Sequence, residues 1–155
     1  IFPDKRFDLV VCVGDAVSYS LDRHDVAIRE LIRVADTSAI ILIGCDSKHG
    51  FAGRSLRKGD LEEFESIMET GICTDWTGVP TKAFEAKEME QLLSDNGCQV
   101  LEIAGTPTFS DTIDKSIYST HEARKRLLEL ELRYCRKTEL LGMGHHLLFV
   151  ARKTR

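Results

Sequence analysis

The sequence predicts an α/β fold around a mostly parallel β-sheet, because three observations agree. Short apolar runs rich in β-branched residues alternate with amphipathic stretches, as strands and helices do when they follow one another along a chain. The first unit, over residues 7–45, has the order strand, helix, strand, which implies a right-handed crossover between parallel strands. A length of 155 residues with 43% hydrophobic residues suits one globular domain, residues 1–155, with a buried core.

The first strand is predicted over Phe7–Val13, a nearly continuous apolar run typical of a strand buried on both faces. The helix that follows has Asp22 as its candidate N-cap and places Ile28 and Ile32 on one face. A second buried strand follows over residues 38–45. The first two strands and the helix between them therefore form the expected crossover.

Residues 46–82 form a polar, glycine-dotted excursion, with one possible short helix over residues 60–70. A clear amphipathic helix is predicted over residues 85–97, where Gly97 suits a left-handed C-terminal cap. Long excursions of this kind often carry function.

The rest of the chain supplies two further strands and a long helix. A third strand is predicted over residues 98–105, an amphipathic helix over residues 119–137, and a final strand over residues 145–153. There are no internal repeats and no low-complexity tracts.

Charge and cysteine content limit the classes of partner. A formal net charge of -4 provides no overall attraction to nucleic acid or to an anionic membrane surface, so neither is expected as a partner. The five cysteines are scattered without a C-x-x-C pair, which favours a reducing, cytoplasmic setting. No apolar run approaches the roughly 18 residues of a membrane span.

Most familiar catalytic motifs are missing. Neither glycine-rich phosphate loop pattern occurs, and Gly142–Gly144 stands between a helix and a strand, where a turn is expected. His145 and His146 are adjacent and should point to opposite faces of a strand, so we expect no metal site. The pattern G-x-S-x-G is also absent, which disfavours a hydrolase.

The end of the first strand is the best candidate site. In open α/β sheets ligands lie outside the carboxyl ends of parallel strands, and Val13, Gly14 and Asp15 stand at such an end. Gly14 permits close approach, Asp15 can accept hydrogen bonds from a ligand, and Tyr19 adds an aromatic wall. The residues alone leave open the alternative that Gly14 and Asp15 simply end a strand.

Four segments resemble, in order, the second half of a class I S-adenosylmethionine-dependent methyltransferase: "FDLVVCVGDAVSY", "AIRELIRVADTSAIILIG", "FEAKEMEQLLSDNGCQVLEIAG" and "GHHLLFVARK". Glu30–Val34 matches the "E-L-x-R-V" helix signature of that family. The resemblance covers most of the chain. It implies a partial Rossmann-like class I methyltransferase sheet whose final strand is antiparallel and inserts between its neighbours.

Two departures qualify the resemblance. After Val34 the family commonly has Lys-Pro-Gly-Gly, whereas this chain has Ala35–Ser38, so that turn must be built differently. The family's glycine-rich first loop and its ribose-binding acidic residue would lie before Ile1, where the chain starts without a Met. The chain is therefore expected to be the C-terminal portion of a methyltransferase domain without its cofactor-binding N-terminal half, and inactive alone.

The resemblance also implies roles for single residues. Val13, Gly14 and Asp15 would contact the methionine end of the cofactor S-adenosylmethionine, and Tyr19 with the 46–82 excursion would cover a small-molecule methyl acceptor. The chain's own part in such a transfer would be to orient the reactants and exclude water.

Other side chains have weaker claims on the acceptor. His24 or His49 could act as a base, although an exposed loop or helix-start histidine is about three times more probable for each. Trp76 could line the acceptor pocket or equally anchor the excursion on the core.

Two alternatives stay open. The chain could be a non-catalytic interaction module that forms a homodimer through the exposed edge of the Phe7–Val13 strand. A nicotinamide-linked dehydrogenase shares the architecture, but the helix signature and the closing strand resemble methyltransferases instead.

Overall fold

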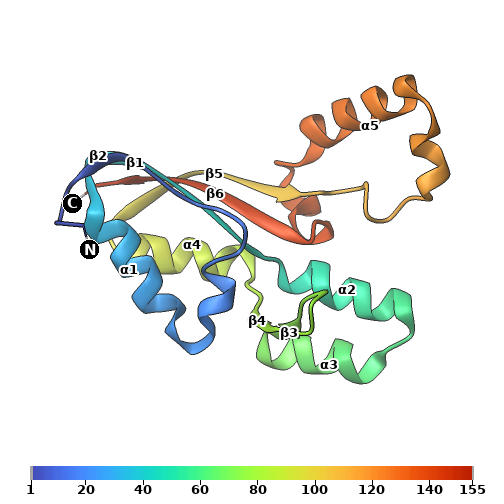
Figure 1. Ribbon diagram of the computed structural model, residues 1–155, viewed down its shortest axis with the longest axis horizontal. Coiled ribbons are helices and arrows are strands. Elements are labelled where there is room, and N and C mark those ends of the chain that lie inside the picture. The colour runs from blue at the N-terminus through green and yellow to red at the C-terminus, as the bar shows by residue number, and fades with distance from the viewer. Residues whose placement is uncertain (1, 155) are drawn as a thin grey trace.

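The computed structural model describes residues 2–154, which form a four-stranded sheet of order β1-β2-β6-β5 and a separate two-stranded hairpin, β3-β4 (Figure 1). The strands are β1 Phe7–Cys12, β2 Ala35–Asp46, β3 Ile72–Thr74, β4 Pro80–Lys82, β5 Cys98–Thr106 and β6 His146–Lys153. The α-helices are α1 His24–Val34, α2 Lys48–Lys58, α3 Leu61–Thr70, α4 Ala86–Asp95 and α5 His121–Tyr134. Short 3-10 helices lie at η1 Ser18–Arg23, η2 Lys115–Ser119 and η3 Thr138–Met143.

The direction of the strands confirms the predicted fold class. β1 and β2 pair in parallel, and β6 lies between β2 and β5 and is antiparallel to both. β5 therefore runs in the same direction as β1 and β2, so the sheet is parallel except for its final strand. The insertion of that strand between its two neighbours is also as predicted.

One face of the sheet carries the main hydrophobic core. In Figure 1, α1 and α4 lie beneath this face. Ile28 and Ile32 of α1, one turn apart, and Met89 and Leu93 of α4, also one turn apart, are buried against the sheet. Each such side chain contributes about 1.5–3 kcal/mol relative to exposure.

The opposite face of the sheet is uncovered near β1. No helix of residues 2–154 lies above it in Figure 1, and Leu9, Val11 and Val13 are 55%, 53% and 55% exposed. β1 is also the edge strand of the described sheet. The prediction that this strand is buried on both faces is therefore wrong for residues 2–154, whereas the predicted unpaired edge is present and an apolar surface accompanies it.

The excursion after β2 contains more structure than the sequence suggests. The predicted helix over residues 60–70 is present as α3, but α2 was missed. Gly50 and Gly53 lower the intrinsic helix propensity of α2, while tertiary packing overrides it. Phe51 and Ala52 of α2 pack with α3 and the hairpin in a second, smaller core.

Two local predictions at α1 and β2 are corrected. Asp22 does not cap α1, because residues 18–23 form the 3-10 helix η1 and α1 begins at His24 without a side-chain cap. β2 begins at Ala35 rather than Ser38, and an irregularity in its pairing with β1 is accompanied by a positive φ of 70° at Ser38. At α4, by contrast, Gly97 adopts the expected left-handed conformation, with φ of 78°.

Close backbone packing fixes α2 against the start of β6. A Cβ atom on Gly50 would lie 2.1 Å from the carbonyl oxygen of Gly144, so neither backbone could keep its place. Where a turn was predicted at Gly142–Gly144, Gly142 and Met143 form the end of η3 and Gly144 follows in an extended conformation. This contact sets the position of α2 beside the candidate site.

The cysteines and the helices show two further features. All five cysteines are free thiols. Within residues 2–154, no helix combines the length and the apolar character needed to cross a membrane.

Candidate functional site

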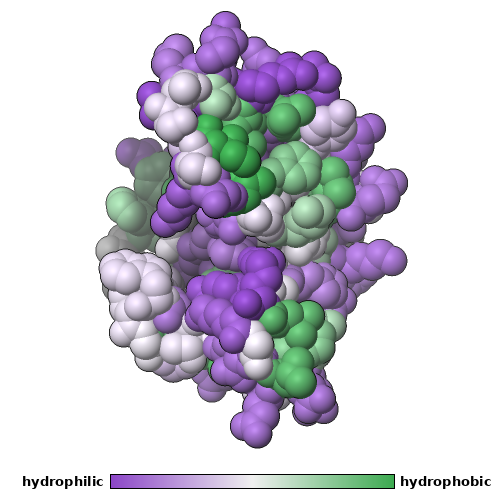
Figure 2. All heavy atoms as spheres, turned by 90° about the vertical axis from the view of Figure 1, so that its right-hand side faces the viewer, coloured by the Kyte–Doolittle hydropathy of each residue, from purple (hydrophilic) through white to green (hydrophobic). Residues whose placement is uncertain are grey.

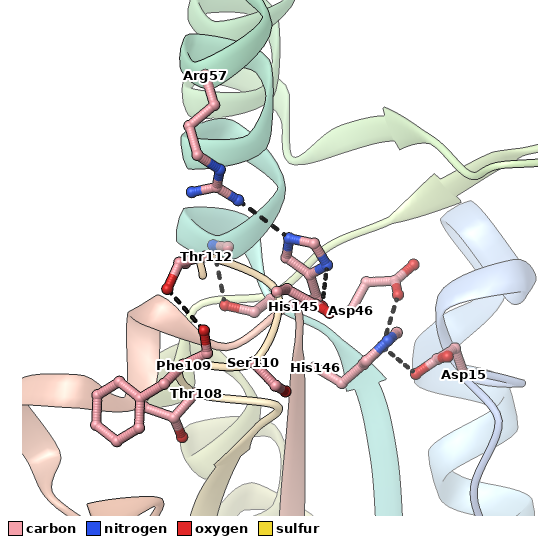
Figure 3. Close-up of polar contacts among 12 residues, drawn as sticks. Asp15, Asp46, Arg57, Thr108, Phe109, Ser110, Thr112, His145 and His146 are labelled. Carbon is pink, nitrogen blue, oxygen red and sulfur yellow. Dashed lines mark hydrogen bonds and ion pairs between the residues drawn. The ribbon is translucent and has the colours of Figure 1, made fainter. Parts of the chain in front are cut away.

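A polar cluster lies where the carboxyl ends of β1 and β2 meet the start of β6. Asp15 follows β1, Asp46 ends β2 and His146 begins β6. Figure 3 shows the His146 ring pointing toward both carboxylates. Because carboxyl ends of parallel strands meet at one edge, residues 131 positions apart in sequence come into contact here.

The cluster places one imidazole nitrogen between two acids. His146 Nδ1 lies 3.2 Å from Asp15 Oδ1 and 3.3 Å from Asp46 Oδ1. The Asp46 side chain is 4% exposed, whereas that of His146 is 38% exposed. His146 Nδ1 donates hydrogen bonds to the carboxylates of Asp15 and Asp46. These bonds raise the pKa of His146 to about 10, so the ring is a cationic imidazolium at neutral pH.

Backbone hydrogen bonds hold this cluster in place. The backbone N–H of Asp46 donates to the buried Ser18 hydroxyl at 2.8 Å, and the Asp46 carbonyl accepts from Phe84 N–H at 2.9 Å. The backbone N–H of Ser47 donates to the His145 carbonyl at 2.7 Å. The end of β2 is therefore pinned to η1, to the segment before α4 and to the start of β6.

The same three side chains could hold a divalent cation. One ligand-type atom from each of Asp15, Asp46 and His146 lies within 4.8 Å of the other two. The spacing of these residues in the sequence does not indicate this grouping, because Asp15 and Asp46 reach His146 only through the fold, and the expectation of no metal site stays a prediction. In the present geometry Nδ1 of His146 lies between the two carboxylates.

The turn after β1 forms an open wall beside this cluster. Gly14 and Asp15 have positive φ values of 75° and 60°, and a Cβ on Gly14 would meet nothing within 4 Å. Val13, just past the end of β1, is more than half exposed. These three residues place open backbone, one carboxylate and an apolar side chain at the carboxyl edge of the sheet.

Tyr19 is tied to the hairpin of the excursion. Its hydroxyl donates to Asp75 Oδ2 at 2.6 Å, and this hydrogen bond raises the pKa of Tyr19 to about 12. Asp75 also accepts from the backbone of Thr77 and Val79. Tyr19 and the excursion are therefore in contact, and the expectation that together they cover a methyl acceptor stays a prediction.

Trp76, next to Asp75, is 90% exposed. The prediction that Trp76 could anchor the excursion on the core is wrong, because its side chain packs on neither core, and Phe51, Ile67 and Cys73 form the small core of the excursion without it. In the present geometry its indole lies on the hairpin tip, in solvent.

His24 and His49 lie outside the Asp15–Asp46–His146 cluster. His24 Nδ1 contacts the Leu21 carbonyl oxygen at 2.5 Å, and its ring packs edge-on against Phe84 with centroids 5.2 Å apart. His49 is exposed on the first turn of α2, and its side chain borders Gly142.

His145 has a different set of partners from His146. Its Nδ1 lies 2.9 Å from Asp111 Oδ2, and Arg57 of α2 donates to its Nε2 at 3.3 Å (Figure 3). Burial lowers the pKa of His145, and the cationic Arg54 and Arg57 lower it further. The ring is therefore neutral, with its proton on the nitrogen that faces Asp111.

The segment that carries Asp111 is fixed from α5. The Glu131 carboxylate accepts backbone hydrogen bonds from Thr108 at 2.8 Å, Phe109 at 2.9 Å and Ser110 at 2.8 Å. Burial alone would raise the pKa of Glu131, but these donors lower it. A deprotonated Glu131 thus orders the loop between β5 and α5.

Sequence reasoning missed Asp46, His146, Arg57 and Asp111. A signal existed for Asp46, because it follows a buried strand as Asp15 does, and two such ends meet at one edge of a parallel sheet. Arg57 and Asp111 gave no such signal, since each lies in a segment whose position depends on tertiary packing.

Solved structures of methyltransferases share this fold. A methyltransferase from Methanosarcina mazei has a TM-score of 0.59 and 16% identity over 99% of this chain and 62% of that chain. A methyltransferase from Thermotoga maritima, described as a possible histamine N-methyltransferase, has a TM-score of 0.55 and 14% identity over 99% and 59%. A putative methyltransferase from Listeria monocytogenes has a TM-score of 0.61 and 12% identity over 100% and 65%.

At such low identity the likeness establishes the fold alone. The chain has the Rossmann-like fold of class I S-adenosylmethionine-dependent methyltransferases, as the resemblance implied, and spans about three fifths of the length of the first two of these structures. No protein-family profile and no curated protein matches the sequence.

Proposed function

We propose that the chain contributes to S-adenosylmethionine-dependent methyl transfer to a small-molecule acceptor. The observation that carries this proposal is the convergence of Asp15, Asp46 and His146 at the carboxyl edge of a methyltransferase-type sheet. Ligands of open α/β sheets lie at this edge. That the chain is the C-terminal portion of a longer catalytic domain, and inactive alone, is part of the proposal.

Residues Val13, Gly14 and Asp15 would hold the methionine end of S-adenosylmethionine. Gly14 leaves its backbone open to close approach, and Asp15 Oδ1 is oriented by His146 at 3.2 Å. Two carboxylates around one imidazolium leave the cluster with a net negative charge, which complements a cation. The cofactor, when bound, supplies an electrophilic methyl group on a sulfonium.

The chain's own contribution is to place and desolvate the acceptor. Tyr19 and the hairpin of the excursion form one wall, held by the Tyr19–Asp75 hydrogen bond. Of the two histidines proposed as a base, His49 is the more accessible, on the exposed first turn of α2. Holding both reactants in line at this edge supplies most of the rate enhancement such a transfer needs from the protein.

Calorimetric titration of S-adenosylmethionine tests the proposal. The ligand is titrated into residues 1–155 and into the product of the whole gene that encodes them. We expect the whole product to bind S-adenosylmethionine saturably. Its Asp15→Asn variant should bind about tenfold more weakly, a change of about 1.4 kcal/mol in the free energy of binding. Asp8→Asn, an exposed carboxylate on β1, is the matched control. Absence of binding by the whole product would contradict the proposal.

A second candidate is an interaction module that dimerises through β1. The unpaired edge of β1 and the exposed Leu9, Val11 and Val13 favour it, because a second copy could extend the sheet and cover this surface. Light scattering should then report a dimer that Val11→Lys dissociates. Val26→Lys, at an exposed valine of α1, is the control. A monomer at all concentrations would exclude the module.

A further inference from the structure

A cavity of about 450 Å³ lies beside the proposed methyl-transfer edge, between α2 and the loop that precedes η2. Its lining includes Arg54, Arg57, Lys58, Asp111, Lys115 and His145. Figure 2 views the end of the molecule that carries α2 and α5, where hydrophilic side chains lie between two apolar patches. The cavity is thus polar in a region whose surroundings are partly apolar.

The charge in this cavity is opposite to that of the chain as a whole. Four of its lining side chains, Arg54, Arg57, Lys58 and Lys115, are cationic, and one, Asp111, is acidic. Asp111 pairs with His145, whereas none of the four cations forms an ion pair with another of residues 2–154. In a chain of net charge -4, this is a local excess of uncompensated positive charge.

Arg57 is oriented without being neutralised. Its guanidinium donates to Nε2 of His145 at 3.3 Å, and His145 in turn contacts Asp111 at 2.9 Å. Because the group that Arg57 touches is an imidazole nitrogen and not a carboxylate, Arg57 keeps its full charge and its remaining N–H donors. A preoriented guanidinium with free donors suits the two oxygens of a carboxylate or phosphate.

Arg54 also keeps donor capacity. Its guanidinium stacks on Phe51, 4.3 Å from the ring centroid, and one terminal nitrogen donates to the Thr74 carbonyl at 2.8 Å. Its Nε is buried and has no hydrogen-bond partner among the described residues. The stacking and the single bond hold the side chain in place while leaving most of its donors unused.

The cavity adjoins the Asp15–Asp46–His146 cluster. His145 lines the cavity and His146 belongs to the cluster, and their ring centroids are 6.5 Å apart. The cavity and the cluster thus meet at the start of β6, through two neighbouring side chains. One small molecule could therefore place an anionic group in the cavity and its reactive atom at the carboxyl edge.

We propose that the cavity between α2 and the 110–115 segment binds an oxyanion, a carboxylate or phosphate group, of the methyl acceptor. The binding of an oxyanion follows from the side chains of the cavity, and its assignment to the acceptor rests on the proposed methyl transfer. Arg57 is the principal ligand, Arg54, Lys58 and Lys115 add charge, and His145 is a positioning residue for Arg57.

Anion binding is measured calorimetrically on residues 1–155 without S-adenosylmethionine, at low ionic strength, with inorganic phosphate and with benzoate as separate probes. Sodium chloride at matched ionic strength is the reference titration. Arg57→Gln is the test variant, and Arg152→Gln, an exposed arginine on β6 far from the cavity lining, is the matched control. Thermal unfolding without ligand verifies that each variant folds, as expected for two exposed positions.

We expect saturable binding of at least one probe, weakened about tenfold by Arg57→Gln and unchanged by Arg152→Gln. Preference for phosphate or for benzoate identifies which oxyanion the site takes. Lack of saturable binding, or equal binding by Arg57→Gln, would overturn the proposal. The anion assay contains no cofactor, so it is independent of the S-adenosylmethionine titration. If residues 1–155 bind an anion but the whole gene product does not bind S-adenosylmethionine, the oxyanion site stands and only the proposed methyl transfer is rejected.

Discussion

His145 and His146 are neighbours in sequence with opposite surroundings. His146 lies between Asp15 and Asp46, which raise its pKa to about 10, whereas His145 is buried beside Arg57 and has a lowered pKa. Adjacent residues of an extended chain point to opposite sides, so one dipeptide serves both environments. The start of β6 therefore divides the carboxyl edge of the sheet into an acidic half and a basic half.

This division matches the two reactants that we propose. A sulfonium cofactor is a cation and suits the acidic half around Asp15 and Asp46, while an oxyanion of the acceptor suits the basic half around Arg57. Each half attracts one reactant and disfavours the other. Variants that disturb one half and spare the other test the division directly.

Gly50→Ala should have the largest effect, and it acts on the basic half. The added Cβ would lie 2.1 Å from the Gly144 carbonyl oxygen, so α2 must shift and carry Arg57 away from His145. We expect the free energy of unfolding to fall by about 3 kcal/mol. Oxyanion binding should be lost as well. Gly53→Ala, in the same helix with ordinary contacts, should instead gain up to about 1 kcal/mol. Urea denaturation measures both, and equal stabilities would refute the close contact.

Asp46→Asn should have the next largest effect, and it acts on the acidic half. Asp46 is buried and faces the protonated His146 at 3.3 Å, so its neutralisation leaves that charge with Asp15 alone. Because His146 is partly exposed, we expect the free energy of unfolding to fall by about 2 kcal/mol, which is less than the full cost of breaking a buried ion pair. Asp8→Asn on the exposed part of β1 should show no change. Unaltered phosphate binding by Asp46→Asn would show that the two halves are independent.

The sequence predicted the sheet well because its signals are local. Residues 7–12 and 146–153 form strands as their continuous apolar patterns indicate, and β6 takes the antiparallel position that the resemblance implied. α2 escaped prediction because Gly50 and Gly53 weaken its local pattern, and only packing of Phe51 against α3 and the hairpin stabilises it. The prediction that Asp22 caps α1 is wrong because the 3-10 helix η1 includes that residue.

The site was predictable only in part. Val13, Gly14 and Asp15 could be placed at a carboxyl end from strand position alone, whereas the partners of Asp15 come from a strand end and a strand start far along the chain. The basic half requires α2 and the 110–115 loop to meet at His145, which no spacing in the sequence encodes. Roles that depend on long-range packing therefore became visible only in three dimensions.

The two histidines should affect stability in opposite pH ranges. His146 has a raised folded pKa of about 10, so its stabilisation is complete below its unfolded pKa of about 6.5 and is lost as the pH rises toward about 10. His145 has a lowered folded pKa, so it destabilises the fold as the pH falls below about 6.5. Urea denaturation at a series of pH values gives the free energy of unfolding as a function of pH. His146→Gln should reduce the change of this free energy with pH in the alkaline range, and His145→Gln should reduce it in the acidic range. A single shared range would contradict the division.

Tyr19→Phe should have the smallest effect, because its hydrogen bond to Asp75 at 2.6 Å lies on the surface. The bond fastens the hairpin next to the acidic half, so its loss should weaken S-adenosylmethionine binding by the whole gene product slightly and leave phosphate binding to residues 1–155 unchanged. Ultraviolet absorbance tests the contact itself: one of the three tyrosines should ionise near pH 12 and shift toward about 10 in Asp75→Asn. If that variant ionises like the wild type, Tyr19 does not hold the hairpin, and the hairpin is then not fixed beside the acidic half by this bond.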